Sequence, residues 1–449
     1  MKLMIHFRRI LAIRLAKLAA ILIRFFHLGN GASFPGYLAR TIDPEILPAL
    51  SSMVRKKIIA VMGTNGKTTT NSILYHALKG EGKRVISNRT GANMLDGIVS
   101  AFVLGTDRYG KLDADYACLE VDENASLYIL PKLRPDCVLL TNISRDQLDR
   151  FGEIDLTRKR IRTALSKLPK ARLVINCDDV LSASLMASCP NPAVTYGINE
   201  PIFDDCSRSG IRESIFCCSC GQKLSYEFFH YGQLGIYRCP GCGQKRPEPD
   251  YTISPAAVQN GAYSFALGSS RLFCKVQAPY NIYNTLAAYA ALCALNAPME
   301  HFEKTMTHFD FGNHRELTFF IHGARVQLHL AKNPVSFQQK ISLIRKDPSP
   351  KDLIIQIHDN APDGKDVSYL WDVDFQYLAD SNCSTITTTG RRRHDMELRL
   401  KYEDIPCRTD GHIGRLIRDL TRHGTGNLYI LVNYSGLYRM KRLLQRMEK

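Results

Sequence analysis

The chain has 449 residues, 45% of them hydrophobic, which is enough to bury the cores of two or three domains. Its formal net charge of +16 favours an acidic partner, whether a nucleic acid, an anionic membrane surface or a phosphorylated substrate. Fourteen cysteines stand in a chain without a secretory signal, so we expect reduced thiols and read their spacings for metal before disulfides. The composition therefore argues against a disulfide-stabilised secreted domain.

Residues 1–53 form a basic N-terminal segment. The stretch from Met1 to Gly31 has no acidic residue, and its charges interrupt every apolar run long enough to span a bilayer. We predict an amphipathic basic helix rather than a signal peptide. Two interpretations stay open, contact with an anionic membrane surface and packing of the helix on its own protein. The basic residues are Lys2, Arg8, Arg9, Arg14, Lys17 and Arg24.

Buried-strand patterns alternate with helical ones through residues 54–311. The runs IIAVM, RVISN, YACLEV, DCVLLTN and ARLVIN are nearly continuous in aliphatic residues, which suits a parallel sheet covered on both faces. We expect a doubly wound α/β domain here, interrupted by an insertion at 204–250 that is rich in Cys, Gly and Tyr. Residues 312–449 repeat the alternation with ARVQLHL, DLIIQI, TITTTG and NLYILVN, which predicts a second, smaller α/β domain.

The stretch VMGTNGKTTT, residues 61–70, lies between a predicted strand and a predicted helix. It nearly matches the phosphate-binding pattern G-x-x-x-x-G-K-[ST], but Val61 stands where the first glycine belongs. Glycines there let backbone amides approach phosphate oxygens, while an ammonium and a hydroxyl hold phosphate and Mg²⁺ at the helix N-terminus. The expected ATP-binding residues are Gly63, Thr64, Asn65, Gly66, Lys67, Thr68 and Thr69.

The form GTNGKTTT resembles the Mur ligase superfamily of peptidoglycan amino-acid ligases, and further motifs follow in that family's order. LEVDENAS looks like its strand-end acidic motif, which implies that Glu120 and Thr68 hold the catalytic Mg²⁺. LTNISRDQLDRFGE resembles its TNI..DHLD..G motif, with Gln147 in place of a metal-proximal His. Gln can offer a carbonyl oxygen but cannot titrate, so whether Gln147 replaces the usual His in a metal contact stays open. The matching positions in that motif are Asn142, Asp146 and Asp149.

Two later segments complete this resemblance. APYNIYNTLAA is similar to the family's N-x-x-N-x-x-AA motif, which implies that Asn281 and Asn284 lie beside the adenine. HRE lies where the family enters its C-terminal Rossmann-like domain, which implies that Arg315 reaches the nucleotide.

Two C-x-x-C knuckles, CCSCG and CPGCG, occur in the insertion, each followed by glycine. Such pairs let four thiolates converge on Zn²⁺, and the closed set predicts a structural rather than a catalytic ion. Cys218 is adjacent to the first knuckle and could replace its first ligand. The nearby aromatic residues suit either a protein interface or the small ribbon's own core. The predicted ligands are Cys217, Cys220, Cys239 and Cys242, and the aromatic residues are Tyr226, Phe228, Phe229, Tyr231 and Tyr237.

A Mur-type core with a zinc ribbon inserted in it resembles the MurT family, the ligase subunits of lipid II isoglutaminyl synthases. AKNPVSF and HDNAPDGKDVSYLWDVDF support this, the latter similar to the family's DNxxDGxDxSWxWD signature with Tyr369 in place of Trp. By itself the acidic loop is either a site or a set of solvated acids. The resemblance implies that Asp366 is functional, orienting the catalytic His of a glutaminase partner. The loop's acids are Asp359, Asp363, Asp366, Asp372 and Asp374.

The implied function is ATP-dependent amidation of the α-carboxylate of D-glutamate in the lipid II stem peptide, giving D-isoglutamine through an acyl phosphate. Lys67 and Glu120 would serve phosphoryl transfer, and a GatD-like glutaminase subunit would supply ammonia. The expected cofactors are ATP, Mg²⁺ and structural Zn²⁺, and the expected location is cytoplasmic and peripheral at the inner membrane face. One alternative is a conventional Mur-type amino-acid ligase. A nucleic-acid-binding NTPase is the other, and the motif order argues against it, so no nucleic-acid partner is expected.

Overall fold

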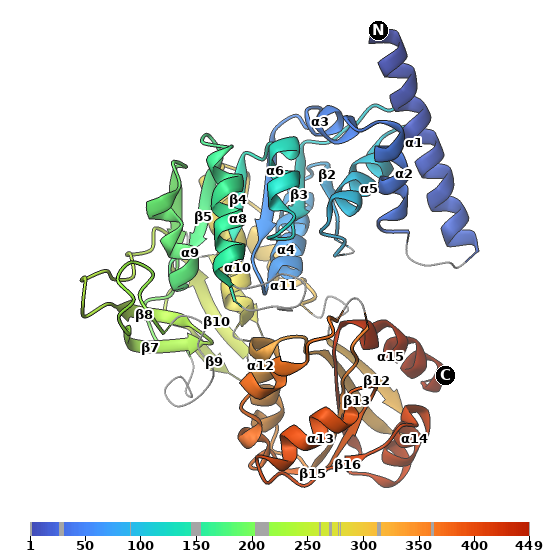
Figure 1. The fold of residues 1–449 in the computed structure, drawn as a ribbon, viewed down its shortest axis with the longest axis vertical. Helices are drawn as coiled ribbons and strands as arrows, with labels where there is room; N and C mark the ends of the chain where they lie inside the picture. Colours follow the sequence, from blue (N-terminus) through green and yellow to red (C-terminus); the bar gives the residue numbers. More distant parts are fainter. Residues whose placement is uncertain are drawn as a thin grey trace. The chain divides into compact units, whose positions relative to one another are not determined.

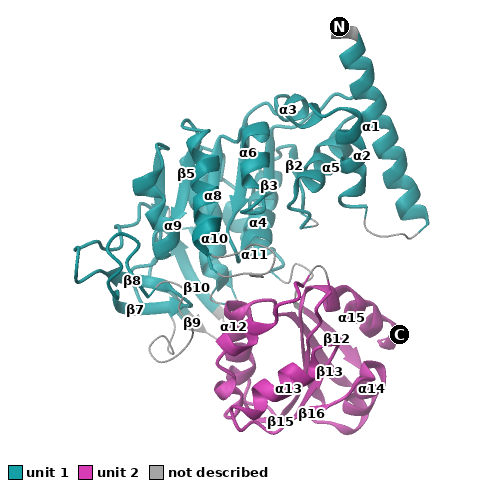
Figure 2. Ribbon diagram, in the orientation of Figure 1, with its two compact units in different colours: residues 1–144, 154–206, 214–311 teal, residues 145–153, 207–213, 312–449 magenta. Residues whose placement is uncertain are grey.

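The chain divides into two compact units in the computed structural model (Figures 1 and 2). Unit 1 takes in the described residues up to Phe311, and unit 2 those from Glu316 onward. The structure describes residues 2–26, 31–89, 91–144, 154–202, 215–259, 262–268, 272–276, 278, 280–311, 316–360 and 363–448. Asp146, Gln147, Asp149 and Arg315 lie outside these ranges.

A six-stranded parallel sheet forms the centre of unit 1, with strand order β2-β3-β1-β4-β5-β6. The order reverses beside β1, so the carboxyl ends of β1, β3 and β4 meet at one edge, where doubly wound sheets bind ligands. The predicted parallel α/β fold is confirmed here. The strands are β1 (Lys57–Met62), β2 (Val85–Ser87), β3 (Tyr116–Glu120), β4 (Cys137–Leu140), β5 (Arg172–Asn176) and β6 (Ala193–Tyr196).

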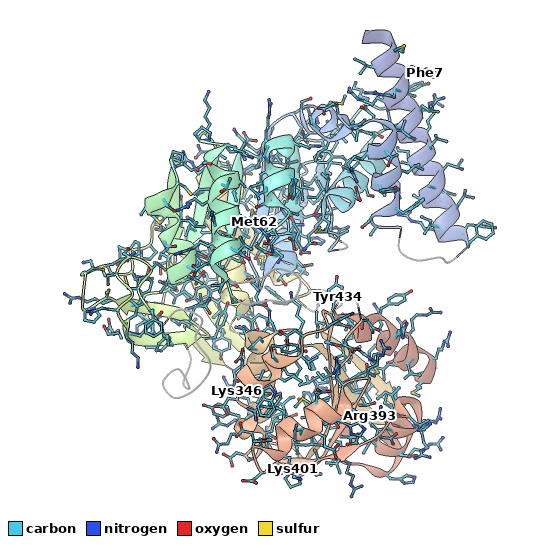
Figure 3. The ribbon with its side chains drawn as sticks, in the orientation of Figure 1. Phe7, Met62, Lys346, Arg393, Lys401 and Tyr434 are labelled. Atoms are coloured by element: carbon cyan, nitrogen blue, oxygen red, sulfur yellow. The ribbon has the colours of Figure 1, made fainter. Side chains whose placement is uncertain are left out.

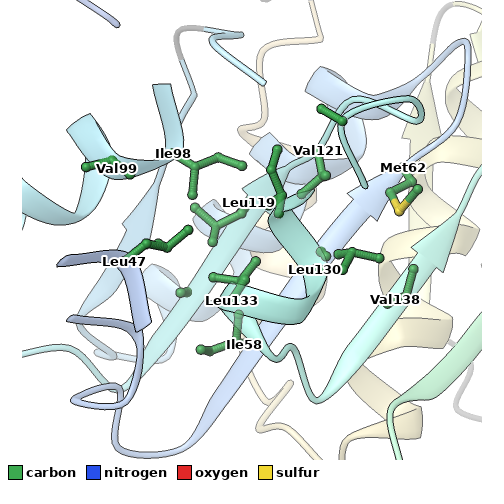
Figure 4. Close-up of a cluster of buried hydrophobic side chains, with 14 of the residues drawn as sticks. Leu47, Ile58, Met62, Ile98, Val99, Leu119, Val121, Leu130, Leu133 and Val138 are labelled. Atoms are coloured by element: carbon green, nitrogen blue, oxygen red, sulfur yellow. The ribbon is translucent and has the colours of Figure 1, made fainter. Parts of the chain in front are cut away.

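Both faces of this sheet are covered, as continuous aliphatic strands require. Along β1, Ile58, Ala60 and Met62 point into one core, and Ile59 and Val61 into the other. Figure 4 shows part of the first core, where Leu47, Ile98 and Leu130 pack on the strands. The first face carries α5 (Leu95–Gly105), α6 (Ser126–Leu133) and α8 (Ile154–Ser166), and the second carries α4 (Lys67–Gly80), α10 (Tyr280–Ala294) and α11 (Phe302–Thr307).

Three N-terminal helices extend the first face. They are α1 (Lys2–Phe25), α2 (Phe34–Ile42) and α3 (Ile46–Ser51). Helix α1 packs against α2 and α5, so the predicted basic helix is present and part of it contacts its own protein. Within the described part of the chain, none of the helices combines the length and apolarity that crossing a bilayer requires.

Two smaller β structures follow β6. The hairpin of β7 (Ser225–Tyr231) and β8 (Leu234–Arg238) belongs to the insertion. An antiparallel sheet of β9 (Ala257–Gln259), β10 (Ala262–Leu267) and β11 (Leu272–Val276) packs on the second core. The helix α9 (Val180–Ser184) and the 3₁₀ turn η1 (Met186–Ser188) lie between β5 and β6.

Unit 2 is a second α/β layer around a six-stranded sheet of order β12-β13-β17-β14-β15-β16. All neighbours are parallel except β12, which pairs antiparallel with β13. The strands are β12 (Glu316–Ile321), β13 (Ala324–Leu330), β14 (Lys351–Gln356), β15 (Cys383–Thr389), β16 (Arg408–Thr409) and β17 (Asn427–Val432). The helices are α12 (Pro334–Lys346), η3 (Ser368–Asp372), η4 (Phe375–Leu378), α13 (Arg393–Lys401), α14 (Ile413–His423) and α15 (Tyr434–Met447).

Candidate active site

The loop from Gly63 to Gly66 joins the end of β1 to the first turn of α4. Its two glycines have left-handed φ angles of +124° and +86°. A side chain at Gly63 would collide with Thr141, and one at Gly66 with Asn284, so both positions need glycine for space as well as for conformation. Val61 is fully buried in β1, beside Glu120 of β3. The strict motif's first glycine is thus replaced by an ordinary strand residue.

The segment after β4 fixes the path of this loop. Thr64 N donates to Asn142 O at 2.8 Å, and Thr64 Oγ1 donates to Ser144 O at 2.9 Å. Asn142 Oδ1 accepts from Asn65 N at 3.1 Å, while its Nδ2 donates to Asn65 O at 3.0 Å. These bonds span 77 to 80 residues of sequence, so the loop is held open by a neighbouring strand end rather than by its own local turn.

The ammonium of Lys67 lies inside this loop and is 2.8 Å from Glu123 Oε1. The same oxygen accepts from Gly63 N at 2.8 Å, and both charged side chains are buried. Burial alone lowers the pKa of Lys67, but the nearby charges of Glu123 and Glu120 outweigh it and raise that pKa above its ordinary value. Burial raises the pKa of Glu123, and the Lys67 charge offsets part of that shift. Lys67 is therefore a protonated donor paired with a carboxylate that an incoming phosphate could replace.

Glu120 ends β3 directly beside the loop. Its Oε2 accepts from Thr68 Oγ1 at 2.7 Å, and its Oε1 accepts from Asn93 Nδ2 at 3.3 Å. The backbone of Glu120 is held by Asn88, which accepts from its N–H and donates to its C=O, each at 2.8 Å. A hydroxyl and a carboxylate beside a phosphate loop are the hard oxygen ligands that Mg²⁺ prefers, so this donor set fits the ion.

Helix α10 brings two asparagines to the other side of the loop. Asn284 Oδ1 accepts from Thr70 Oγ1 at 3.3 Å, and Asn284 Nδ2 donates to Asn281 Oδ1 at 3.0 Å. Both amides are buried. Asn284 thus contacts the first turn of α4, the turn that contains Thr69 and follows Gly66.

The insertion is connected to the loop through residues that the sequence reasoning missed. Gln233, at the turn of the β7–β8 hairpin, donates through Nε2 to Ile143 O at 2.8 Å and to Asp179 Oδ1 at 3.1 Å. Asp179 Oδ2 accepts from Ile143 N at 2.8 Å, so both backbone groups of Ile143 are satisfied by these side chains. Ile143 lies between Asn142 and Ser144, which hold the loop.

A buried ion pair anchors the far end of the insertion to the same region. Arg246 Nε donates to Asp178 Oδ1 at 2.7 Å, and Asp178 Oδ2 accepts from Tyr283 Oη at 2.5 Å and from Ile198 N at 2.8 Å. The Arg246 and Asp178 side chains are 3% and 0% exposed, so removing either would leave an unpaired buried charge. Asp178 and Asp179 come just after the predicted strand ARLVIN, and no role was predicted for them.

The four predicted cysteines converge in the insertion. Their sulfurs all lie within 4.8 Å of one another, with Cys217 Sγ to Cys242 Sγ at 3.6 Å and Cys220 Sγ to Cys239 Sγ at 3.4 Å. Tetrahedral Zn–S bonds place sulfurs about 3.8 Å apart, so the set fits Zn²⁺. Cys218 points elsewhere and packs in the hydrophobic cores.

The two knuckles have the same backbone geometry. Gly221 and Gly243 both have φ of +73°, and their N–H groups donate to Cys217 O at 2.9 Å and to Cys239 O at 3.1 Å. This repeat explains why glycine follows each C-x-x-C pair, since the left-handed turn closes each knuckle.

The aromatic residues of the insertion pack mainly within the protein. Tyr226 stacks on Phe229 with ring centroids 4.0 Å apart, and Tyr237 is buried with Cys217 and Cys239. Tyr231 contacts Tyr283 of α10 at 5.6 Å between centroids. These contacts favour the core interpretation over an exposed aromatic interface.

In unit 2, the carboxylates of the acidic loop after β14 make different kinds of contact. Asp359 pairs with Arg392 at 3.0 Å, and Asp363 accepts from Ser435 N at 2.8 Å, which joins the loop to the start of α15. Asp374 caps η4. Asp366 is partly exposed and accepts from Ser368 N at 2.8 Å. It therefore differs from the neighbours that hold the loop in place.

The segment AKNPVSF starts α12 at the end of β13. The Asn333 side chain accepts from Ser336 N at 2.9 Å, and Ser336 Oγ accepts from Asn333 N at 3.0 Å, forming a capping box. Its residues therefore have a local structural role.

Comparison with known proteins agrees with this architecture. Residues 61–235 match the Mur ligase middle domain, and residues 330–437 match the MurT ligase C-terminal domain. A Mur-type ATP-dependent ligase is thus the class that the sheet, the phosphate loop and the second unit define. The fold also resembles a pseudomurein peptide ligase type C from Methanothermus fervidus, with a TM-score of 0.69 and 20% identity over 89% of this chain and 80% of that one.

Full-length relatives narrow this class. The chain is 34% identical to the Staphylococcus aureus (strain COL) lipid II isoglutaminyl synthase (glutamine-hydrolyzing) subunit MurT, over 88% of each protein. It is 32% identical to the corresponding Streptococcus pneumoniae (strain ATCC BAA-255 / R6) subunit, over 93% of each. The chain belongs to this MurT family of ligases.

Proposed function

We propose that the chain catalyses ATP-dependent amidation of the α-carboxylate of D-glutamate in the lipid II stem peptide, giving D-isoglutamine. The observation that carries this is the convergence of Lys67, Thr68 and Glu120 at the phosphate loop, in a chain that spans 88% of a lipid II isoglutaminyl synthase subunit. A carboxylate is a poor electrophile, so the reaction must first activate it.

Activation proceeds through an acyl phosphate. A carboxylate oxygen attacks the γ-phosphorus of ATP and ADP leaves; the nitrogen of ammonia then attacks the acyl carbon, phosphate leaves and a proton is lost. Lys67 neutralises charge on the transferring phosphoryl group, since its ammonium is protonated and already held in the loop. Thr68 and Glu120 would hold Mg²⁺, which supplies further charge neutralisation when bound.

The remaining nucleotide contacts belong to the loop and to residues near it. Gly63, Thr64, Asn65 and Gly66, with Thr69 of α4, surround the phosphates, and the N–H of Gly63 is released when phosphate displaces Glu123. Asn281, Asn284 and Arg315 serve the nucleoside side. Support comes from the position of Asn284 against Gly66 and Thr70.

Ammonia comes from a GatD-like glutaminase subunit, and Asp366 of this chain completes that partner's site. Ammonia is mostly protonated near neutral pH, so delivery through a protein complex favours the reactive form. Asp366 suits such a role because it is partly exposed while the neighbouring acids are occupied in holding the loop. It would orient a catalytic His of the partner as the third member of a Cys-His-Asp arrangement.

The four cysteines bind one structural Zn²⁺. Its chemistry would be to cross-link the two knuckles, leaving no open coordination position. Elemental analysis should find about one zinc per chain, lost in Cys239→Ser and retained in the matched variant Cys218→Ser. Equal zinc content in both variants would contradict this ligand set.

The chain works at the cytoplasmic face of the membrane as a peripheral protein, because its proposed substrate is lipid-linked. The test of the overall function is amidation of lipid II by purified chain with ATP, using ammonia alone or glutamine plus a co-purified glutaminase subunit. We expect product with ammonia alone, and with glutamine only when the partner is present. A conventional amino-acid ligase would instead turn over ATP with an amino acid and need neither glutamine nor a partner.

A further inference from the structure

Helix α1 is apolar on two opposite sides. One side packs against α2 and α5 through a row of residues that are at most 3% exposed, namely Ala12, Ile13, Ala16 and Ala20. Four small or branched residues at helical spacing bring the helix close to its neighbours. This side is therefore part of the core of unit 1.

The opposite side carries a second apolar row, which we call the outer stripe. Its residues recur every three or four positions, as one face of a helix does. Phe7, labelled near the start of α1 in Figure 3, belongs to it. The stripe consists of Met4 (76% exposed), Phe7 (69%), Leu11 (42%), Leu15 (39%), Leu18 (52%), Leu22 (45%) and Phe25 (74%). Such continuous apolar exposure marks an interaction surface.

Only positive charges accompany the outer stripe on this helix, which has no acidic residue. Arg8 and Arg9 pair with the buried carboxylate of Asp43, at 3.2 and 3.1 Å, and Lys17 donates to Thr106 O. Arg14 and Arg24 are exposed. The surface thus combines an apolar row with uncompensated positive charge.

Anionic lipid fits this combination better than a second copy of the helix. Two copies paired along the stripe would bring like charges together, with no acidic side chain on either helix to pair with them. An anionic bilayer surface offers acyl chains for the stripe and negative headgroups for the arginines. The helix is about 36 Å long at 1.5 Å per residue, enough for its stripe of about six turns to lie flat in the interface.

We propose that α1 docks unit 1 on anionic membranes, with the outer stripe inserted at the headgroup boundary and Arg14 and Arg24 contacting lipid phosphates. Docking would keep the active site at the surface that holds a lipid-linked substrate, so its benefit rests on the proposed function. Because the opposite side of α1 is part of the core of unit 1, the helix can bind lipid without unfolding from its own protein.

Co-sedimentation of the full chain with vesicles tests this docking. Vesicles of phosphatidylglycerol and phosphatidylethanolamine, free of lipid II, are compared with vesicles of phosphatidylcholine alone. We expect binding to the anionic vesicles only, reduced about a hundredfold in the triple variant Leu11→Gln, Leu18→Gln, Leu22→Gln. The matched control replaces three exposed leucines of other helices, Leu156, Leu343 and Leu398, by Gln and should bind like the unaltered chain.

A second variant tests the docking even if the triple leucine variant fails to fold. Arg14→Glu with Arg24→Glu leaves the apolar row intact and should weaken binding to anionic vesicles about tenfold or more. Unchanged binding in both variants would overturn the proposal. So would an unaltered chain that ignores vesicles but forms a dimer in solution that the triple variant dissociates, since the stripe would then pair two copies.

Amidation of lipid II in detergent separates the two claims. If vesicle binding fails while detergent-solubilised lipid II is still amidated, the docking is wrong and the proposed function stands. If vesicles bind as expected and no amidation occurs with ATP and ammonia, the proposed function is wrong.

Discussion

The phosphate loop of unit 1 and the acidic loop of unit 2 both follow a buried parallel strand, yet they are built differently. Beside the phosphate loop, Lys67 of α4 and Glu120 of β3 are each less than a tenth exposed and bonded to partners within the same unit. In the acidic loop, Asp363 bonds to Ser435 and Asp359 pairs with Arg392, and these contacts fix the loop. Asp366 is partly exposed and accepts a hydrogen bond from the nearby backbone N–H of Ser368.

This difference indicates two kinds of site. The phosphate loop has its charges and donors already arranged, as catalysis of phosphoryl transfer by electrostatic preorganisation requires. The acidic loop leaves Asp366 partly exposed, which suits its proposed role of completing a site on another protein. The variants below test this contrast in order of decreasing effect.

Lys67→Ala should abolish ligation with both nitrogen donors. Losing the buried ammonium removes about 4 kcal/mol of transition-state stabilisation, a roughly thousandfold or greater fall in kcat. Lys79→Ala, in the last turn of the same helix and exposed, is the matched control and should keep full activity. Ammonia-dependent amidation surviving in Lys67→Ala would show that the loop does not activate the carboxylate.

Glu123→Gln should destabilise the chain in the absence of nucleotide, because it leaves the Lys67 ammonium buried without its carboxylate. The expected loss is about 3 kcal/mol of unfolding free energy. Saturating Mg-ATP should restore most of it, since phosphate takes the place of the carboxylate. Thermal unfolding with and without nucleotide measures this, with the exposed Glu227→Gln as control. An ATP-independent loss would mean that the pair is purely structural.

Asp366→Asn should lower amidation with glutamine but not amidation with ammonia. The amide keeps the acceptor oxygen for Ser368 N, so the loop should stay folded while the negative charge is lost. With the glutaminase subunit present, we expect glutamine-dependent amidation to fall about a hundredfold or more and ammonia-dependent amidation to stay near normal. Asp380→Asn, exposed in the same unit, is the control. Equal loss with both donors would instead place Asp366 in the ligase step.

Gln233→Ala should have the smallest effect. It removes the donor to Ile143 O and Asp179, and thereby loosens the segment that holds Thr64 and Asn65. We expect KM for ATP to rise about three- to tenfold, equivalent to about 1 kcal/mol, with kcat little changed. Lys223→Ala, exposed on the insertion, should leave KM unaltered. A lower melting temperature with an unchanged KM would limit Gln233 to a structural role.

The sequence predicted those parts of the fold that depend on short-range patterns. The aliphatic run around Ile58 and Ile59 predicted β1, and the motif after it predicted a loop followed by a helix, since the order of these elements depends on neighbouring residues. The two C-x-x-C pairs could be recognised in the sequence for the same reason, because each knuckle is closed by the glycine that follows it.

The sequence did not predict which distant residues contact the site. Glu123 is three residues beyond the predicted Glu120, yet only the structure places it on Lys67, 56 residues away in sequence. Gln233 contacts Ile143 across 90 residues, and nothing in its local sequence indicates that contact. The antiparallel sheet of β9, β10 and β11 was also missed, because its strands are short and only partly apolar.

Oxygen transfer from substrate to phosphate tests the central claim most directly. Lipid II carrying ¹⁸O at both oxygens of the α-carboxylate of D-glutamate would be amidated with ATP and ammonia, and the released inorganic phosphate analysed by mass spectrometry. An acyl phosphate requires one labelled oxygen in the phosphate for each amide formed, with ADP as the other product. Amide formation with unlabelled phosphate, or with AMP and pyrophosphate, would contradict activation at this phosphate loop as proposed.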